Sequence, residues 1–436
     1  MHTSTATSTA PVAITAVDHA QPAPVPEPEP AGAASGLRPQ QRLLARLLRH
    51  LQCGTLLVTL PDGRRMEAKG RQPGPAASIT LHSWRPLSQV LLHGDIGLAL
   101  SFRDGNWFTP DLTALLELGL RNEAAWGAAL QASAPARWFN RLAHLLRSNT
   151  RKGSRQNIAF HYDLGNDFYA QWLDDSMLYS SGIYGHDGPG ETLEAAQVRK
   201  LDRILGLLDL QPDSQVLEIG CGWGALSTAI AQAAPHGRVT GLTLSKEQLQ
   251  HARERVGAAG LSDRVALQLQ DYRDVQGSFD RIVSIEMLEA VGERYWPTYF
   301  DTLRQRLAPG GIAVVQVITI AQASFERYRS EPDFIQRFIF PGGMLPTESA
   351  LAAQAGRAGL TLQTAQTFGA SYARTLADWR QRFVAAWPTI EPLGFDDAFR
   401  RLWLYYLSYC EAGFLTGRVD VGLYVLRHAP RASVQA

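Results

Sequence analysis

Cysteine is scarce in this sequence. Its three cysteines, Cys53, Cys221 and Cys410, stand far apart in 436 residues. They form no zinc-binding pattern, so we expect no metal site. The N-terminus also lacks the basic stretch, apolar core and cleavage site of a secretory signal. Both absences favour a protein of the reducing cytoplasm.

Neither charge sign is in excess, and long apolar runs are missing. The formal net charge of +1 gives no global attraction to nucleic acid, so we expect no nucleic-acid partner. No uninterrupted apolar run is long enough to cross a bilayer. With 45% hydrophobic and 19% charged residues, the composition is typical of a folded globular protein. A chain of 436 residues exceeds what one hydrophobic core usually supports, so we expect two domains and tails.

The N-terminal part divides into a tail and a small domain. Residues 1–36 are rich in Ala, Thr, Pro and Glu and have too little apolar surface to fold, which predicts a disordered tail. Residues 37–135 are expected to form a small α+β domain. Its predicted elements are strands at 54–60, 77–84 and 97–108, a hairpin turn at Pro61–Gly63, and a helix that Asp111 caps and that ends at Arg121.

Acidic residues are absent between Glu123 and Asp163. Apolar side chains such as Trp138 and Leu145 alternate there with cations, namely Arg137, Arg141, Arg147, Arg151, Lys152 and Arg155. A basic amphipathic segment of this kind is typical of peptides that lie on an anionic bilayer. The alternative is a connector with a solvated basic face. We therefore expect residues 136–155 to be a basic linker, with peripheral contact to an anionic membrane surface as the functional interpretation.

Residues 156–436 alternate strand-like and helix-like segments. Such alternation predicts a parallel sheet with helices on both faces. The strands are expected at 215–219, 239–243, 265–269, 281–285, 312–319, 360–367 and 419–426.

A glycine-rich turn follows the first of these strands. It places Glu218 in a buried strand and then Gly220, Gly222 and Gly224 before a helix. Glycines at these places let the backbone turn tightly and approach a ligand without a Cβ in the way. The spacing differs from a dinucleotide fingerprint, and no Lys-Ser/Thr follows as in a phosphate loop. A methyltransferase cofactor turn is the interpretation that remains.

Several motifs in order resemble the cyclopropane-fatty-acid-synthase family. The most specific is the segment from His161 to Ser181, and five others agree, at 216–224, 279–292, 334–346, 368–383 and 405–414. The resemblance runs from about Arg155 to the C-terminus. It implies a class I methyltransferase fold, with a Rossmann-like sheet and a lipid-binding insertion at about 320–345. The domain at 37–135 is similar to the sterol-carrier-like domain found in some members.

The resemblance implies S-adenosylmethionine as cofactor. The glycine turn would hold it, and the ends of the next two strands would complete the site, as expected at the carboxyl edge of an open α/β sheet. The implied cofactor residues are Tyr179, Ser180, Glu218, Gly220, Gly222, Gly224, Thr243, Leu244, Gln248, Asp271 and Tyr272.

The chemistry that the family catalyses explains the acceptor residues. An alkene attacks the sulfonium methyl only where water is excluded, and aromatic faces stabilise the resulting cation. The candidates are Tyr162, Phe168, Tyr169, Tyr179, Phe334, Phe338 and Phe340. Ring closure then needs a base, which in the family is a bound bicarbonate.

The resemblance assigns the bicarbonate to the side chains of Glu289 and Tyr372 and to the backbone at Ser181 and Ile318. Gln316 stands where the family has a histidine; it donates a hydrogen bond but carries no charge. The resemblance therefore implies a bicarbonate site in an altered form.

The leading hypothesis is methyl transfer to the double bond of an acyl chain in a phospholipid, followed by cyclopropane closure. Three alternatives stay open: a product with a methylene or methyl branch, N-methylation of a small amine, and a lipid-binding protein with a degenerate cofactor site. The expected location is the cytoplasm, in peripheral association with the inner face of the membrane. A homodimer is one alternative for the oligomeric state.

Overall fold

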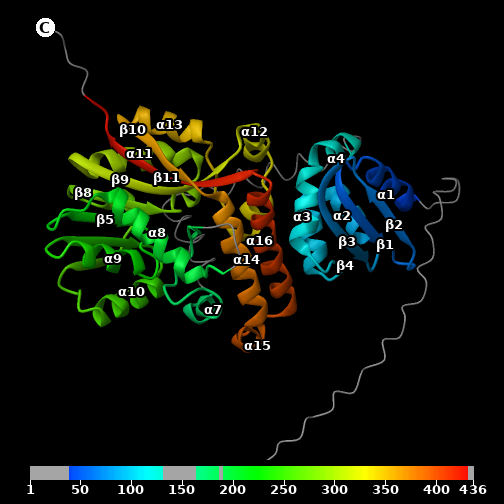
Figure 1. Cartoon of the computed structure of the whole chain (residues 1–436), viewed down its shortest axis with the longest axis horizontal. Helices are drawn as coiled ribbons and strands as arrows, with labels where there is room; N and C mark the ends of the chain where they lie inside the picture. Colours follow the sequence, from blue (N-terminus) through cyan, green and yellow to red (C-terminus); the bar gives the residue numbers. More distant parts are fainter. Residues whose placement is uncertain (1–38, 131–163, 186–189, 431–436) are drawn as a thin grey trace, which may run out of the picture.

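The computed structural model describes residues 39–130, 164–185 and 190–430. The expected tail at 1–36 and basic linker at 136–155 lie outside these residues. Figure 1 shows a small N-terminal unit beside a larger unit built on a long twisted sheet, with a pair of helices between them. The domain boundaries stay a prediction.

The N-terminal unit is a four-stranded sheet of order β2-β1-β3-β4 with helices against it. Its elements are α1 (Pro39–Arg49), β1 (Cys53–Thr59), β2 (Arg65–Lys69), β3 (Gln72–Leu81), α2 (Arg85–Arg103), β4 (Trp107–Phe108), α3 (Leu112–Arg121) and α4 (Glu123–Leu130).

The prediction of a strand at 97–108 is wrong for most of that range. Residues up to Arg103 belong to α2, which bends at Gly94 (φ 61°), and only Trp107–Phe108 pair with β3. The run Gly97–Phe102 alternates apolar residues, but short apolar runs do not separate strand from helix by period alone. Tertiary packing decides, because this half of α2 buries Ile96, Ala99 and Phe102. The predicted cap is present: the side chain of Asp111 accepts from the backbone N–H of Ala114.

The larger unit has a seven-stranded sheet of order β10-β11-β9-β8-β5-β6-β7. All strands are parallel except β11, which runs antiparallel to both neighbours. This confirms the expected class I methyltransferase fold. The strands are β5 (Gln215–Ile219), β6 (Arg238–Thr243), β7 (Val265–Leu269), β8 (Phe279–Ile285), β9 (Leu307–Ile320), β10 (Leu360–Thr367) and β11 (Val419–His428).

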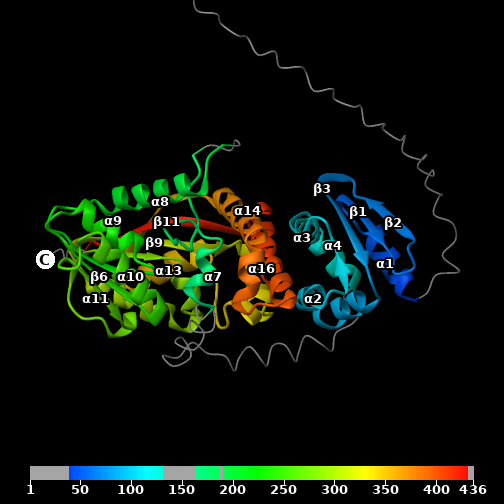
Figure 2. The same cartoon turned by 90° about the horizontal axis from the view of Figure 1, so that it is seen from below.

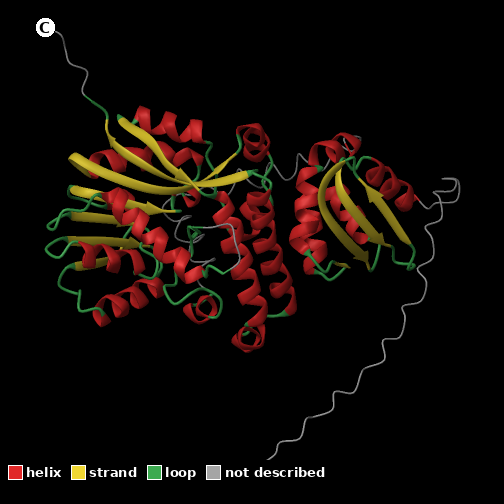
Figure 3. Cartoon of the chain, viewed as in Figure 1, coloured by secondary structure: helices red, strands yellow, loops and turns green. Residues whose placement is uncertain are grey.

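Helices lie on both sides of the sheet (Figure 3). Alternate residues of each strand therefore face two separate cores. On one side Val216, Val239 and Val314 pack with α8 (Leu193–Leu208), α9 (Ala225–Ala233) and α10 (Lys246–Ala258). On the other, Leu217, Leu242 and Val315 pack with α11 (Trp296–Arg306) and α13 (Glu348–Arg357).

The remaining helices cover the carboxyl edge of the sheet. They are α7 (Asn166–Ala170), α12 (Gln322–Ser330), α14 (Gly369–Ala385), α15 (Trp387–Ile390) and α16 (Asp397–Leu415), with a π-helical turn, η5 (Ile335–Ile339). Short 3₁₀ turns complete the unit at η2 (Tyr272–Asp274), η3 (Leu288–Ala290), η4 (Glu293–Tyr295) and η6 (Glu391–Leu393).

The two units meet at α16, which lies between α14 and the N-terminal helices in both views (Figures 1 and 2). Thr113 in α3 donates to the Glu411 carboxylate in α16 at 2.9 Å. Arg418 forms an ion pair with Glu123 at 2.6 Å. Among the described helices, none is long and apolar enough to span a bilayer.

Candidate active site

One cavity of about 310 Å³ opens at the carboxyl ends of the parallel strands. One part of its wall is the turn after β5 with the ends of β6 and β7. Another part is apolar and comes from Ile320, η5, Met344, Phe414 and Leu120 of the N-terminal unit. The cavity therefore joins the expected cofactor site to an apolar space beside α14 and α16, the pair of helices between the two units.

The three glycines of the turn have different roles. Gly220 (φ 85°) and Gly222 (φ 50°) line the cavity, and a Cβ on Gly222 would point into open space. A Cβ on Gly224 would lie 2.9 Å from the Cβ of Ala252 in α10. Gly224 therefore serves the close packing of α10, and Gly222 leaves room for a ligand. A Cβ on Gly220 would lie 3.1 Å from the Met287 side chain.

The ends of β6 and β7 contribute most of the other predicted cofactor residues. Thr243, Leu244 and Gln248 line the cavity, and the Thr243 hydroxyl donates to the Gln248 side chain at 2.9 Å. Tyr272 also lines it. Asp271 is buried with its carboxylate in an ion pair with Arg273 at 2.6 Å. The wall beside Tyr272 is instead formed by Gln270, which the sequence interpretation had not named.

Tyr179, Ser180 and Glu218 complete the predicted cofactor set at the cavity wall. Glu218 is buried and accepts from the Ser227 hydroxyl, and burial raises its pKa to about 7. Ser180 accepts from the ammonium of Lys200 at 2.7 Å. Lys200 is fully buried in α8, and burial lowers its pKa to about 8.

The acceptor residues gather around a carboxylate that the sequence interpretation left without a role. This is Glu286, the residue after β8. Its Oε1 accepts from the backbone N–H of Ser181 at 3.0 Å and from the Gln316 amide at 2.6 Å. Its Oε2 accepts from the Tyr372 hydroxyl at 2.6 Å. Three of the groups expected around an anion thus bind Glu286.

Glu289, the carboxylate predicted to hold the anion, also lines the cavity but binds a different partner. Its Oε1 accepts from the backbone N–H of Ile318 at 2.6 Å, and its Oε2 has no hydrogen-bond partner among the described residues. The structure therefore brings all five predicted acceptor residues together, arranged around two carboxylates where the sequence interpretation had one.

The two carboxylates hold their protons differently. Burial raises the pKa of Glu289 to about 8, and the charge of Glu286 adds to this. Burial also raises the pKa of Glu286, but the Tyr372 hydroxyl, the Ser181 N–H and the charge of Lys200 oppose it. Close carboxylates do not readily both ionise, so negative charge on the pair is favoured at Glu286, and Glu289 is the more readily protonated of the two.

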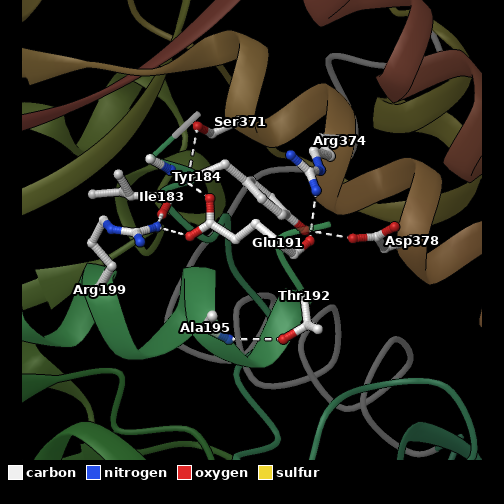
Figure 4. A network of polar contacts seen from close by, with 10 residues as sticks. Ile183, Tyr184, Glu191, Thr192, Ala195, Arg199, Ser371, Arg374 and Asp378 are labelled. Atoms are coloured by element: carbon white, nitrogen blue, oxygen red, sulfur yellow. Dashed lines mark hydrogen bonds and ion pairs between the residues drawn. The ribbon is translucent and has the colours of Figure 1, made fainter. Parts of the chain in front are cut away.

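A polar network fixes the loop that carries Ser181 (Figure 4). The backbone N–H of Tyr184 donates to Ser371 at 3.1 Å, and the Tyr184 hydroxyl donates to Asp378 at 2.6 Å. Arg374 lies over the Tyr184 ring and donates to the backbone carbonyl of Glu191 at 2.5 Å. Since Ser371, Arg374 and Asp378 all belong to α14, the network ties the loop to the helix that carries Tyr372.

The predicted aromatic candidates separate into wall and core. Tyr179 and Phe340 line the cavity, where Tyr406 joins them; the Tyr179 and Tyr406 hydroxyls are 2.7 Å apart. Phe168, Tyr169 and Phe334 are fully buried, and Phe338 packs against the core. Tyr162 lies outside the described residues.

The residues fit S-adenosylmethionine, because the open space beside Gly222 continues past Thr243 and Gln248 to the ring of Tyr272. They do not fit a separate bicarbonate in the same way, since the four donors expected for it already bind Glu286 and Glu289. Within the described ranges, no three His, Cys, Asp or Glu residues form a group that could hold a metal.

Comparisons with known proteins agree with this geometry. A family model described as mycolic acid cyclopropane synthetase matches residues 149–423. A tuberculostearic acid methyltransferase of Mycobacterium tuberculosis is 38% identical over 405 residues, 90% of this chain and 92% of the relative. A cyclopropane-fatty-acyl-phospholipid synthase of Escherichia coli is 36% identical over 75% of this chain and 81% of the relative.

Solved structures give the same match over the larger unit. A cyclopropane synthase of M. tuberculosis superposes with a TM-score of 0.58 at 30% identity and covers 62% of this chain and 97% of that one. A mycolic acid cyclopropane synthase complexed with SAH and CTAB gives 0.57 at 28% identity and covers the same shares.

Proposed function

The chain belongs to the mycolic acid cyclopropane synthetase family, and from that premise we propose that it methylates the double bond of an unsaturated fatty acyl chain in a phospholipid. It is an S-adenosylmethionine-dependent methyltransferase. The observation that carries the substrate is a continuous cavity, which runs from the cofactor turn at Gly222 past Glu286 to the apolar wall at Met344 and Phe414. An acyl chain is the ligand that such a wall accommodates.

The chain's own residues prepare the acceptor. When bound, S-adenosylmethionine supplies an electrophilic methyl group. The apolar wall excludes water, which would otherwise trap the cation formed on the acyl chain. The ring faces of Tyr179, Phe340 and Tyr406 stabilise that cation and offer no carbon that bonds to it readily.

Cyclopropane closure is the proposed outcome for the cation. The new methyl group loses a proton, and the electrons of that C–H bond close the ring. The second candidate is a methylene or methyl branch. Gln316 in place of a histidine favours it, as does the relative that aligns with 90% of this chain and is named a methyltransferase. A methylene product also requires loss of a proton from the new methyl group, so both outcomes need a base at the same point.

Phospholipid as the carrier of the acyl chain is supported by the E. coli relative, whose name states that substrate. A surface element is then needed to reach the bilayer, and the cations at 137–155 are the proposed one, outside the described residues. We place the enzyme in the cytoplasm, peripheral to the inner face of the membrane. A homodimer stays an alternative.

A methyl-donor assay tests the proposal. Purified protein is incubated with radiolabelled S-adenosylmethionine and either oleoyl phospholipid vesicles, saturated phospholipid vesicles or small amines. We expect label only in the oleoyl lipid, because the attacking electrons come from the double bond. Labelling of an amine, or equal labelling of saturated lipid, would contradict the proposal.

A further inference from the structure

Glu286 stands at a backbone position that does not suit a glutamate. Its φ of 51° lies in the left-handed region, where glycine is the usual residue. The backbone N–H of Glu286 donates to the carbonyl of Gln316 at 2.9 Å, which holds the residue against β9. Strain of this kind persists where the surroundings fix it, and it gathers at functional sites. The backbone conformation of Glu286 therefore costs conformational free energy, which a glutamate with a merely structural role would not need.

The strained backbone delivers the carboxylate to a complete set of donors. Both oxygens are bound: Oε1 by the Ser181 N–H and the Gln316 amide, and Oε2 by the Tyr372 hydroxyl. These donors are those that the family resemblance assigns to a small anion. The chain thus fills the position of the anion with one of its own side chains.

A second anion at this point would be opposed by charge. It would have to displace Glu286 from its donors or lie beside the carboxylate, where like charges repel. The remaining donor, the Ile318 N–H, binds Glu289 at 2.6 Å. Gln316 adds no positive charge to offset a second anion.

We propose that the carboxylate of Glu286 is the built-in base of the reaction and takes the proton that the methylated acyl chain loses, so that the enzyme needs no bicarbonate. This inference rests on the proposed methyl transfer. The double-bond electrons form a C–C bond to the methyl group as its bond to sulfur breaks. The carboxylate then removes a proton from that methyl group, and the C–H electrons close the ring onto the neighbouring cationic carbon. For a methylene product, a hydride first shifts from the methylated carbon to that cationic carbon, and the same C–H electrons then form the C=CH₂ bond. The Glu286 carboxylic acid returns its proton to solvent before the next turnover.

Two variants and a bicarbonate titration test this base. Glu286→Gln keeps the shape of the side chain and removes its basicity. Glu286→Gly suits the φ of 51° and opens a space that bicarbonate can enter between the same donors. Glu348→Gln is the matched control, because Glu348 also accepts from a tyrosine, Tyr424 at 3.2 Å, away from the cavity. All proteins are assayed in CO₂-free buffer and again with added bicarbonate.

We expect the wild type to keep its full rate in CO₂-free buffer. Glu286→Gln should lose about a hundredfold or more of turnover, the contribution usual for a positioned base, and should keep its S-adenosylmethionine affinity by calorimetry. Glu286→Gly should lose as much and recover at least about tenfold with bicarbonate. As a readout independent of turnover, ¹³C NMR should detect labelled bicarbonate bound to Glu286→Gly and not to the wild type.

The inference is overturned if the wild type binds labelled bicarbonate and stops in CO₂-free buffer, or if folded Glu286→Gln matches the wild-type rate. Either result would leave the methyl transfer itself intact. A wild type that methylates no acyl chain, with or without bicarbonate, would instead refute the proposed function.

Discussion

Replacing Tyr372 by phenylalanine tests how the site controls the charge of Glu286. The change removes the hydroxyl that donates to Glu286 at 2.6 Å and keeps the ring that stacks on Phe414 with centroids 4.5 Å apart. A hydrogen bond to a charged acceptor contributes about 1.5–3 kcal/mol. About 1.4 kcal/mol corresponds to a tenfold change in a protonation equilibrium. The Tyr372 bond is therefore large enough to move the titration of Glu286 measurably.

The direction follows from which form the bond stabilises. The hydroxyl binds the charged carboxylate, so its loss raises the pKa of Glu286 further above the usual value for a glutamate. A base acts only when it is deprotonated. Turnover plotted against pH rises on its acid limb as the base loses its proton. We therefore expect this acid limb to move to higher pH by about one to two pH units in the variant, with little loss of rate at the alkaline plateau.

The assay is turnover against pH with saturating cofactor and oleoyl vesicles, beside calorimetry of cofactor binding. Tyr424→Phe is the matched control, because Tyr424 donates to the Glu348 carboxylate from a fully buried position in β11. Its acid limb should stay at the wild-type pH. A Tyr372→Phe profile that keeps the wild-type limb, or moves to lower pH, would refute this reasoning.

Three further predictions concern the cofactor, the second carboxylate and the membrane. Gly222→Val should abolish S-adenosylmethionine binding, because its side chain would enter the open space of the cavity; unchanged affinity by calorimetry in a folded variant would contradict the site. Glu289 binds its proton more tightly when folded, with a pKa near 8 against the usual 4.5, so its stabilising effect is present below pH 4.5 and is lost as the pH rises to about 8. The Glu289→Gln variant should not show this loss. Between pH 5 and pH 8, the free energy of unfolding of the wild type should fall by on the order of 3 kcal/mol more than that of the variant. An equal fall in both proteins would contradict the prediction. Finally, replacing four cations by glutamine should reduce the cosedimentation of the protein with anionic vesicles at low salt and leave its cofactor affinity unchanged; the four are Arg141, Arg147, Arg151 and Lys152. Equal cosedimentation of the variant and the wild type would contradict the membrane interpretation.

The sheet of the larger unit could be predicted closely, because most of its strands are short apolar runs between clear turn and cap signals. The predicted bounds of 215–219, 265–269 and 360–367 coincide with β5, β7 and β10. In the N-terminal unit the same procedure failed at 97–103. A Gly-Leu-Ala-Leu-Ser-Phe run fits either period, and its contacts in the folded unit selected the helix.

The acceptor site shows where sequence reasoning ended. The motifs located Glu289, Tyr372 and Gln316, but which carboxylate meets the donors depends on backbone conformation, and the positive φ of Glu286 is not visible in the sequence. Lys200 was also missed, although a signal existed. It lies on the apolar face of α8 between Ala196 and Ile204, where a cation is unexpected and a charged partner is required.

The most direct test of the account is the fate of a deuterated methyl group. Protein, S-adenosylmethionine carrying a CD₃ group, and oleoyl phospholipid vesicles are incubated together, and the acyl chains are analysed by mass spectrometry with hydrogenation to separate cyclopropane from methylene. The account predicts an added carbon that keeps two of the three deuterium atoms, because the third leaves to the base. An acyl chain without deuterium, while the cofactor is consumed, would contradict it.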